Sequence, residues 1–77
     1  MIFLVEYNRS KGELVTFETF ADADLAKAEA ARLRMEIDQI ASGATHEIVL
    51  LEADSEAAIR RTHRRYFETF AELVTIP

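Results

Sequence analysis

Four arginines within six residues form the segment of this sequence with the most distinctive chemistry. Arg60 to Arg65 reads Arg-Arg-Thr-His-Arg-Arg, and Tyr66 follows directly. On one side of a helix, four guanidinium groups could bind phosphates while a neighbouring tyrosine ring stacks on a base. One set of candidate residues for binding a partner or a nucleic acid follows: Arg60, Arg61, Arg64, Arg65 and Tyr66.

Two less specific interpretations of the arginine segment stay open. Glu56 and Glu68 lie four positions from arginines and could pair with them, which would leave an ordinary solvated helix face. Alternatively, the arginines dock on an acidic surface of a protein partner or of another copy, because the rest of the chain carries five basic and fourteen acidic residues. The net charge of −5 disfavours general affinity for RNA or DNA, so nucleic-acid binding is the alternative to a protein-interaction or regulatory function.

The two histidines do not belong to a recognisable catalytic or metal-binding pattern. His63 is predicted to pack at the edge of the core beside Ile59 and Tyr66, since nothing near it in sequence forms a nucleophile and base pair. His46 is equally isolated, and its spacing from the nearby glutamates matches no common set of zinc ligands. We therefore expect no catalytic residues and no bound metal.

Phosphate-binding loops, thiol chemistry and disulfides are excluded by residue types that the chain lacks. Gly12 and Gly43 are the only glycines, and both fall where turns are expected, so the sequence contains no glycine-rich phosphate loop. With no cysteine, there is no thiolate zinc site, iron–sulfur cluster or disulfide. A chain this small also has little room for a pocket that excludes water, so we predict a non-enzymatic protein without a cofactor.

Length and composition predict one small globular domain spanning residues 1–77. Hydrophobic residues make up 49% of the chain and charged residues 30%, as in ordinary globular proteins. A chain of this size buries only about 60% of its unfolded surface, so its core is thin. The opening apolar run from Met1 to Val5 is too short to span a membrane and has no basic flank typical of a signal peptide. We expect a cytoplasmic protein with no membrane association.

The first nineteen residues are predicted to form an antiparallel hairpin. Residues 2–7 and 14–19 are rich in β-branched and aromatic side chains, and the five residues 8–12 between them favour a turn, with Gly12 supplying a positive φ. The first strand is apolar on both faces, which indicates a central strand. Glu6 and Glu18 are expected to meet across this hairpin.

A long amphipathic helix over residues 22–43 is the element around which the rest of the chain is expected to be organised. Gly43 can adopt the left-handed conformation that ends a helix, and Asp22 and Asp24 can accept hydrogen bonds at its start. Spacings of three and four residues place five apolar side chains along one side. These residues are Ala26, Ala30, Leu33, Ile37 and Ile40.

The second half of the chain is predicted to add one strand and one helix. Residues 46–52 form a short apolar run and are expected to pair with the first strand, giving the strand order 2-1-3. Asp54 and Ser55 can cap a second long helix that runs to about residue 73 or 74, although residues 69–76 could instead form a short fourth strand. The predicted fold class is α+β: a ββαβα two-layer sandwich of a three-stranded antiparallel sheet and two long helices.

Self-association is expected from the apolar surface of the predicted sheet. If both helices pack on one face, the other face keeps too many large apolar side chains for a small monomer. Either the helices divide between the two faces or two chains share a sheet face, and we predict a homodimer. The opening hairpin and long helix, about residues 1–41, resemble in arrangement the small β-hairpin–helix regulatory domains of bacterial antitoxins. This resemblance assigns no role to any residue. The GxxG clamp of the RNA-binding KH module is absent.

Overall fold

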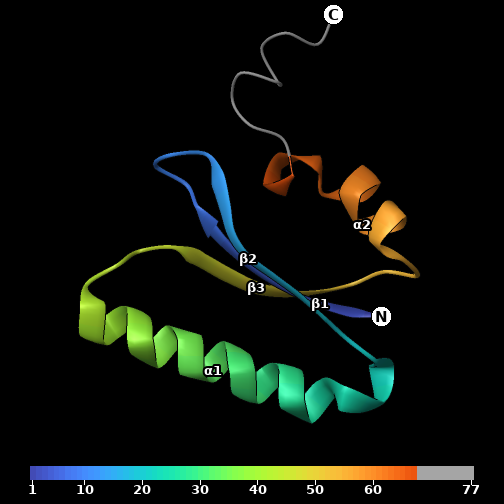
Figure 1. Ribbon diagram of the computed structural model, residues 1–77, viewed down its shortest axis with the longest axis horizontal. Helices are drawn as coiled ribbons and strands as arrows, with labels where there is room; N and C mark the ends of the chain where they lie inside the picture. The colour runs from blue at the N-terminus through green and yellow to red at the C-terminus, as the bar shows by residue number, and fades with distance from the viewer. Residues whose placement is uncertain (68–77) are drawn as a thin grey trace, which may run out of the picture.

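The computed structural model describes residues 1–67 and contains a three-stranded sheet, two α-helices and two short 3-10 helices (Figure 1). The predicted end of the second helix, or the alternative fourth strand, falls within residues 68–77 and lies outside the described residues. The elements follow one another as β1 (Ile2–Asn8), β2 (Glu13–Phe20), η1 (Asp22–Asp24), α1 (Leu25–Ser42), β3 (Glu47–Glu52), α2 (Glu56–Thr62) and η2 (Arg64–Tyr66).

The sheet is antiparallel with the order β2-β1-β3, which confirms the predicted topology. Phe3 of β1 lies between Thr19 of β2 and Leu51 of β3, and the register with β2 shifts once, between Glu6 and Tyr7. Central placement explains why β1 is the most deeply buried element: its residues from position 2 to position 5 are at most 2% exposed. An apolar strand with two apolar faces is buried on both sides.

The two glycines have the conformations that their turns require. The prediction that Asp22 and Asp24 cap the start of the long helix with their side chains is wrong. Gly12 has φ 65° in the hairpin loop, and Gly43 has φ 77° and donates its N–H to the carbonyl of Gln39 at the end of α1. Asp24 caps α1 without a side-chain hydrogen bond. Asp22 instead forms an ion pair with the N-terminal ammonium group at 2.7 Å, because the β2–α1 connection brings the two together.

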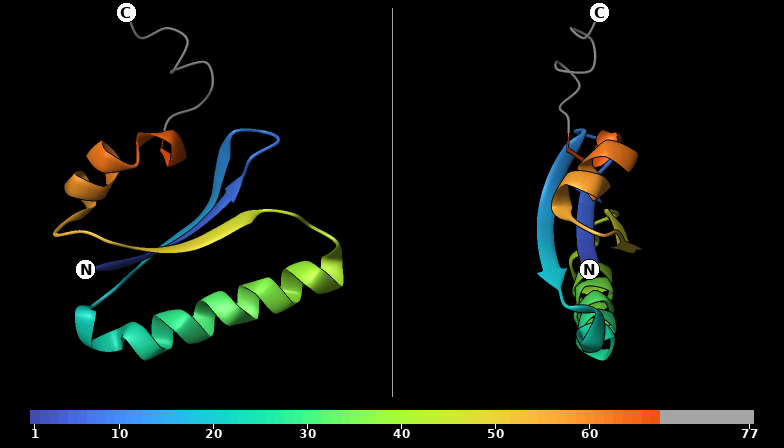
Figure 2. Two further views of the ribbon diagram at one scale, coloured as in Figure 1. Left: turned by 180° about the vertical axis from the view of Figure 1, so that it is seen from behind. Right: turned by 90° about the vertical axis from the view of Figure 1, so that its right-hand side faces the viewer.

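The helices lie on opposite sides of the sheet, so the two-layer arrangement becomes helix, sheet and helix. Figure 1 shows the strands passing between α1 on one side and α2 on the other, and the edge-on view in Figure 2 shows how narrow this stack is. Its extents are 41 × 33 × 11 Å. Glu6 of β1 points toward α1, whereas its neighbours Val5 and Tyr7 pack against Tyr66 of η2.

The second helix is shorter than predicted and ends at Thr62. His63 leaves the helical conformation with φ −125° and ψ 51°, and a 3-10 turn follows. Of the two predicted caps, Asp54 and Ser55, the structure uses Ser55, whose side chain accepts a hydrogen bond from the N–H of Ala58. Aromatic burial explains the early end, because the break turns Tyr66 toward the sheet, where it packs edge-on against Tyr7 with ring centroids 5.2 Å apart.

Helix α1 is shorter than the predicted 22–43, because residues 22–24 form the 3-10 turn η1 and Gly43 caps the end, and it exposes its apolar side. Ala28 is fully buried against the sheet, whereas Leu33 and Ile37 are 56% exposed and Ile40 is 82% exposed. On a helix with 3.6 residues per turn, Ala28 lies nearly opposite the side that carries Leu33 and Ile37. The side predicted to be apolar therefore exists, but it points away from the rest of the chain.

Candidate functional site

The four candidate arginines do not share one helix face, because the break at His63 separates them into two pairs. Arg60 and Arg61 lie on α2, and Arg64 and Arg65 lie on η2. All four side chains are exposed. All four arginines therefore lie at the surface, but as two pairs on two elements and not as a continuous stripe along one helix.

Two of these arginines are engaged by glutamates and aromatic rings. Arg60 forms an ion pair with Glu56 at 3.1 Å and lies over the ring of Phe67. Arg65 donates from Nη2 to both carboxylate oxygens of Glu47 on β3 at 3.0 Å and to the hydroxyl oxygen of Tyr66 at 2.7 Å. The hydrogen bond with Tyr66 raises the pKa of Arg65, so this guanidinium stays cationic. These contacts attach η2 to the sheet.

Tyr66 is a core residue and not an exposed stacking platform. Its side chain is 5% exposed, and its ring also faces His63 with centroids 6.3 Å apart. Burial raises the pKa of the Tyr66 hydroxyl, with Glu47 adding to this effect and Arg65 opposing it. His63 therefore lies at the edge of the core beside Tyr66, as the sequence predicted.

A hydrogen-bonded cluster around Glu6 connects all three strands and was missed by sequence reasoning. One carboxylate oxygen accepts a hydrogen bond from the hydroxyl of Thr16 on β2 at 2.8 Å, and the other lies 2.7 Å from Nδ1 of His46, just before β3. Glu6 thus meets Thr16 and not Glu18, which faces Leu4 in the register. An acidic residue on a central strand that is otherwise apolar is the signal that could have predicted such partners.

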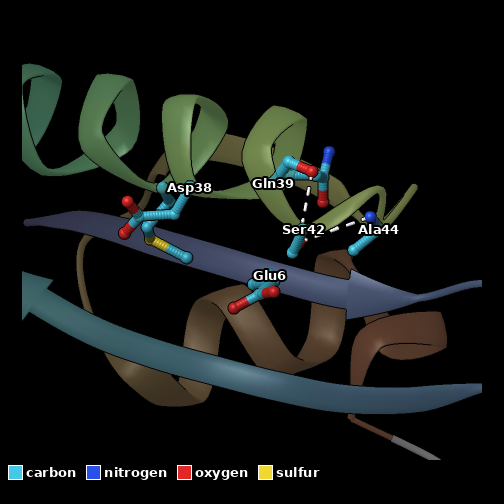
Figure 3. A pocket seen from close by; sticks show the side chains of 6 residues that line it. Glu6, Asp38, Gln39, Ser42 and Ala44 are labelled. Atoms are coloured by element: carbon cyan, nitrogen blue, oxygen red, sulfur yellow. Dashed lines mark hydrogen bonds between the residues drawn. The ribbon is translucent and has the colours of Figure 1, made fainter.

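The carboxylate of Glu6 is held in its charged form. Burial raises its pKa, but the hydrogen bonds with His46 and Thr16 and the electrostatic interaction with His46 together lower the pKa below its ordinary value of 4.5. Figure 3 shows the Glu6 side chain beneath α1, at the bottom of a shallow pocket bordered by Asp38, Gln39 and Ser42. The polar groups of this cluster are therefore used to connect β1 with β2 and with the residue that precedes β3.

Gln39 attaches the C-terminal half of α1 to the start of β3. Its amide nitrogen donates to the carbonyl of His46 at 3.0 Å, and its amide oxygen accepts from the N–H of His46 at 2.8 Å. Since Gln39 lies on the sheet side of α1, this paired bond fixes which way the helix faces. The apolar side is held outward as a result.

The outward side of α1 is the most accessible apolar surface on the described residues. A shallow groove runs along it and is lined by apolar side chains in the middle, with Arg34 and Asp38 along one edge. Neither Arg34 nor Asp38 has an ion pair or a hydrogen bond from its side chain within residues 1–67. We define the outward face of α1 as Ala30, Leu33, Arg34, Ile37, Asp38 and Ile40.

Comparison of the chain with protein families, with curated proteins and with solved structures finds no match. Within residues 1–67, neither helix combines the length and the apolar character that crossing a bilayer requires. No group of three or more acidic or histidine side chains that could hold a metal ion gathers in that same part of the chain. The outward face of α1 and the arginine segment are therefore the two features from which a function can be inferred.

Proposed function

We propose that this protein is a small non-enzymatic interaction domain that self-associates as a homodimer. The observation that carries the proposal is the outward face of α1, where Leu33, Ile37 and Ile40 are more than half exposed. Large aliphatic side chains gathered on one exposed face mark an interaction surface more often than a solvated one.

The surface that supports self-association differs from the sheet face that the sequence suggested. Phe3 and Val5 are fully buried, and Phe17 stacks on Phe3 with ring centroids 5.4 Å apart. Because α2 and η2 cover this side of the sheet with Tyr66 and Phe67, it has little apolar surface left to share. The outward face of α1 takes its place in the proposal.

The test is the oligomeric state in solution as protein concentration rises. The monomer mass is 8.8 kDa, so multi-angle light scattering and sedimentation equilibrium should show a species of twice that mass at high concentration. Ile37→Glu should shift the protein to a monomer, because a charged side chain would then have to be buried in the interface.

Val15→Glu is the matched control for this substitution. Val15 is also an exposed aliphatic residue, 49% exposed, but it lies on β2 and away from α1. The control should keep the dimer. A chain that stays monomeric at all concentrations contradicts the proposal, and a dimer lost only with Val15→Glu would move the interface to the edge of the sheet.

Nucleic-acid binding through the arginine segment is the alternative function, and the structure offers it less support. Arg60 and Arg65 have glutamate partners and Tyr66 is buried, which leaves fewer groups free to bind phosphates and bases. Fluorescence anisotropy with mixed-sequence RNA and DNA at low and physiological salt tests it. Binding that weakens steeply with salt, and that is lost when Arg60, Arg61, Arg64 and Arg65 all become Gln, would establish the alternative.

A further inference from the structure

The geometry of α1 points to an antiparallel pairing of this helix with α1 of a second copy, about a two-fold axis near Ile37. This inference rests on the proposed homodimer and adds its interface and the direction of the helices. It is carried by two independent features of the outward face: the spacing of its apolar residues and the arrangement of its charges.

The apolar residues are self-complementary about a point near Ile37. Leu33 and Ile40 are seven residues apart, so they lie about 10 Å apart along one side of the helix. A two-fold axis crossing the helix near Ile37 puts Leu33 of one copy opposite Ile40 of the other, and puts the two Ile37 side chains against each other. The same patch then serves both copies, as an interface with two-fold symmetry requires.

The charges on the edge of the groove follow the same symmetry. Arg34 and Asp38 lie on one flank of the outward face, are opposite in charge and are four residues apart. Their midpoint is at position 36, within one residue of the axis that the apolar residues define. Antiparallel pairing therefore brings Arg34 of each copy beside Asp38 of the other and forms two equivalent ion pairs.

The other flank of α1 does not oppose this arrangement. Glu36 lies near the proposed axis on that flank, where it could approach its counterpart in the second copy. Its charge is already offset within its own helix by Arg32, whose Nε lies 3.7 Å from the Glu36 carboxylate. Like-charge repulsion between the two glutamates is correspondingly reduced.

A parallel pairing fits the charges less well. In a parallel pair the flank carrying Arg34 and Asp38 would meet the opposite flank of the second copy, which carries Glu29 and Glu36. There Arg34 and Asp38 of one copy would lie equally far along the helix from Glu36 of the other, so one attraction and one repulsion offset each other and no ion pair is favoured. Leu33 would then lie opposite Leu33. The two arrangements differ in which residues meet, and cysteine cross-linking can detect that difference.

The experiment uses the absence of cysteine from the natural chain. Single variants Leu33→Cys, Ile37→Cys and Ile40→Cys are oxidised alone and in mixtures, and disulfide dimers are counted by non-reducing electrophoresis and mass spectrometry. Packed helices bring facing Cα atoms within the range that a disulfide can bridge. We expect Ile37→Cys alone to cross-link, and Leu33→Cys to cross-link with Ile40→Cys in the mixture more than either does alone.

Charge reversal provides a second readout on intact, non-oxidised protein. Arg34→Asp should weaken dimerisation roughly tenfold, because both inter-copy pairs become repulsive. Adding Asp38→Arg to the same chain should restore affinity close to that of the natural chain. Glu29→Arg, a reversal on the opposite flank, is the control and should change affinity by less than about threefold.

The outcomes separate this inference from the proposed function. A natural chain that remains a monomer contradicts both. A dimer in which Leu33→Cys cross-links with itself as readily as with Ile40→Cys overturns the antiparallel arrangement while leaving the homodimer standing. A dimer that forms no cross-link at positions 33, 37 or 40, and that Arg34→Asp does not weaken, places the interface elsewhere and overturns the inference alone.

Discussion

The two sides of the sheet are closed in different ways. On the side of α2 and η2, aromatic rings interlock: Tyr66 packs edge-on against Tyr7, and Phe67 packs edge-on against Phe17 at 5.1 Å. On the side of α1, a small residue, Ala28, makes the buried contact, and polar side chains hold the helix in place. The first side is completed within the chain, whereas the second leaves its largest apolar residues exposed.

This difference shows where the chain's stability and its interactions are located. Burial of large aromatic side chains contributes several times more free energy than burial of an alanine. We therefore expect substitutions on the aromatic side to change folding, and substitutions on the outward face of α1 to change association. Substitutions on one side at a time test this expectation. Unfolding of all variants is compared at one fixed protein concentration, because association adds to the apparent stability.

The largest effect is expected for Tyr66→Ala. Removing this buried ring leaves a cavity against Tyr7 and should lower the free energy of unfolding by about 3 kcal/mol. Urea unfolding followed by circular dichroism measures it, with Arg61→Ala, an exposed change on the same side, expected to stay within about 0.5 kcal/mol. A loss below about 1 kcal/mol for Tyr66→Ala would mean that the aromatic side does not carry the stability.

The same chemical change made on two sides of α1 should give opposite results. Ala28→Leu adds bulk at a fully buried position and should destabilise the fold by about 2 kcal/mol through overpacking. Ala30→Leu adds the same bulk on the outward face, where it should leave the unfolding free energy within about 0.5 kcal/mol and strengthen dimerisation. Equal destabilisation by both variants would contradict the orientation of α1.

A moderate, pH-dependent effect is expected for Glu6→Gln, which tests the polar cluster beneath α1. Charged hydrogen bonds of this kind contribute about 1.5 kcal/mol, so the variant should be less stable than the natural chain by roughly that amount at pH 7. Because the pKa of Glu6 is lowered by folding, its contribution is complete above its ordinary pKa of 4.5 and is lost as the pH falls through the lower value of the folded state.

The measurement for Glu6→Gln is urea unfolding of both proteins from neutral to acidic pH. The difference between them should shrink as the pH drops below 4.5. Glu18→Gln on β2 is the control, since Glu18 is exposed and takes no part in the cluster. A difference between Glu6→Gln and the natural chain that is independent of pH would show that the charge of Glu6 does not matter.

The smallest effect is expected for Gly43→Ala at the end of α1. A Cβ at this position would meet nothing within 4 Å, so the cost comes only from the positive φ and should be about 1 kcal/mol. Thermal unfolding followed by circular dichroism detects it, and Gly43→Asn should lose less, because Asn tolerates the left-handed conformation better. Equal stability of Gly43→Ala and the natural chain would argue against this helix end.

Local patterns were sufficient to predict most elements of the fold. The alternation of β1, the turn residues around Gly12, the cap at Ser55 and the apolar run of β3 each depend on neighbours in sequence, so the sheet order 2-1-3 followed from short-range signals. The candidate site was predicted less well. Arg60 and Arg61 lie on a helix as expected, but the helix stops before Arg64, since burial of Tyr66 outweighs local helix propensity.

The sequence by itself determined that a long helix with one apolar side lies within residues 22–43, because periodicity and a terminal glycine are properties of the local chain. Only the tertiary structure decided which way that side faces. The orientation depends on contacts between residues that are distant in the chain. Gln39 is hydrogen-bonded to His46, Ala28 packs on the sheet, and Glu6 lies beneath α1 in contact with His46. Their combined free energy, which no periodic pattern encodes, turns the apolar side of α1 outward.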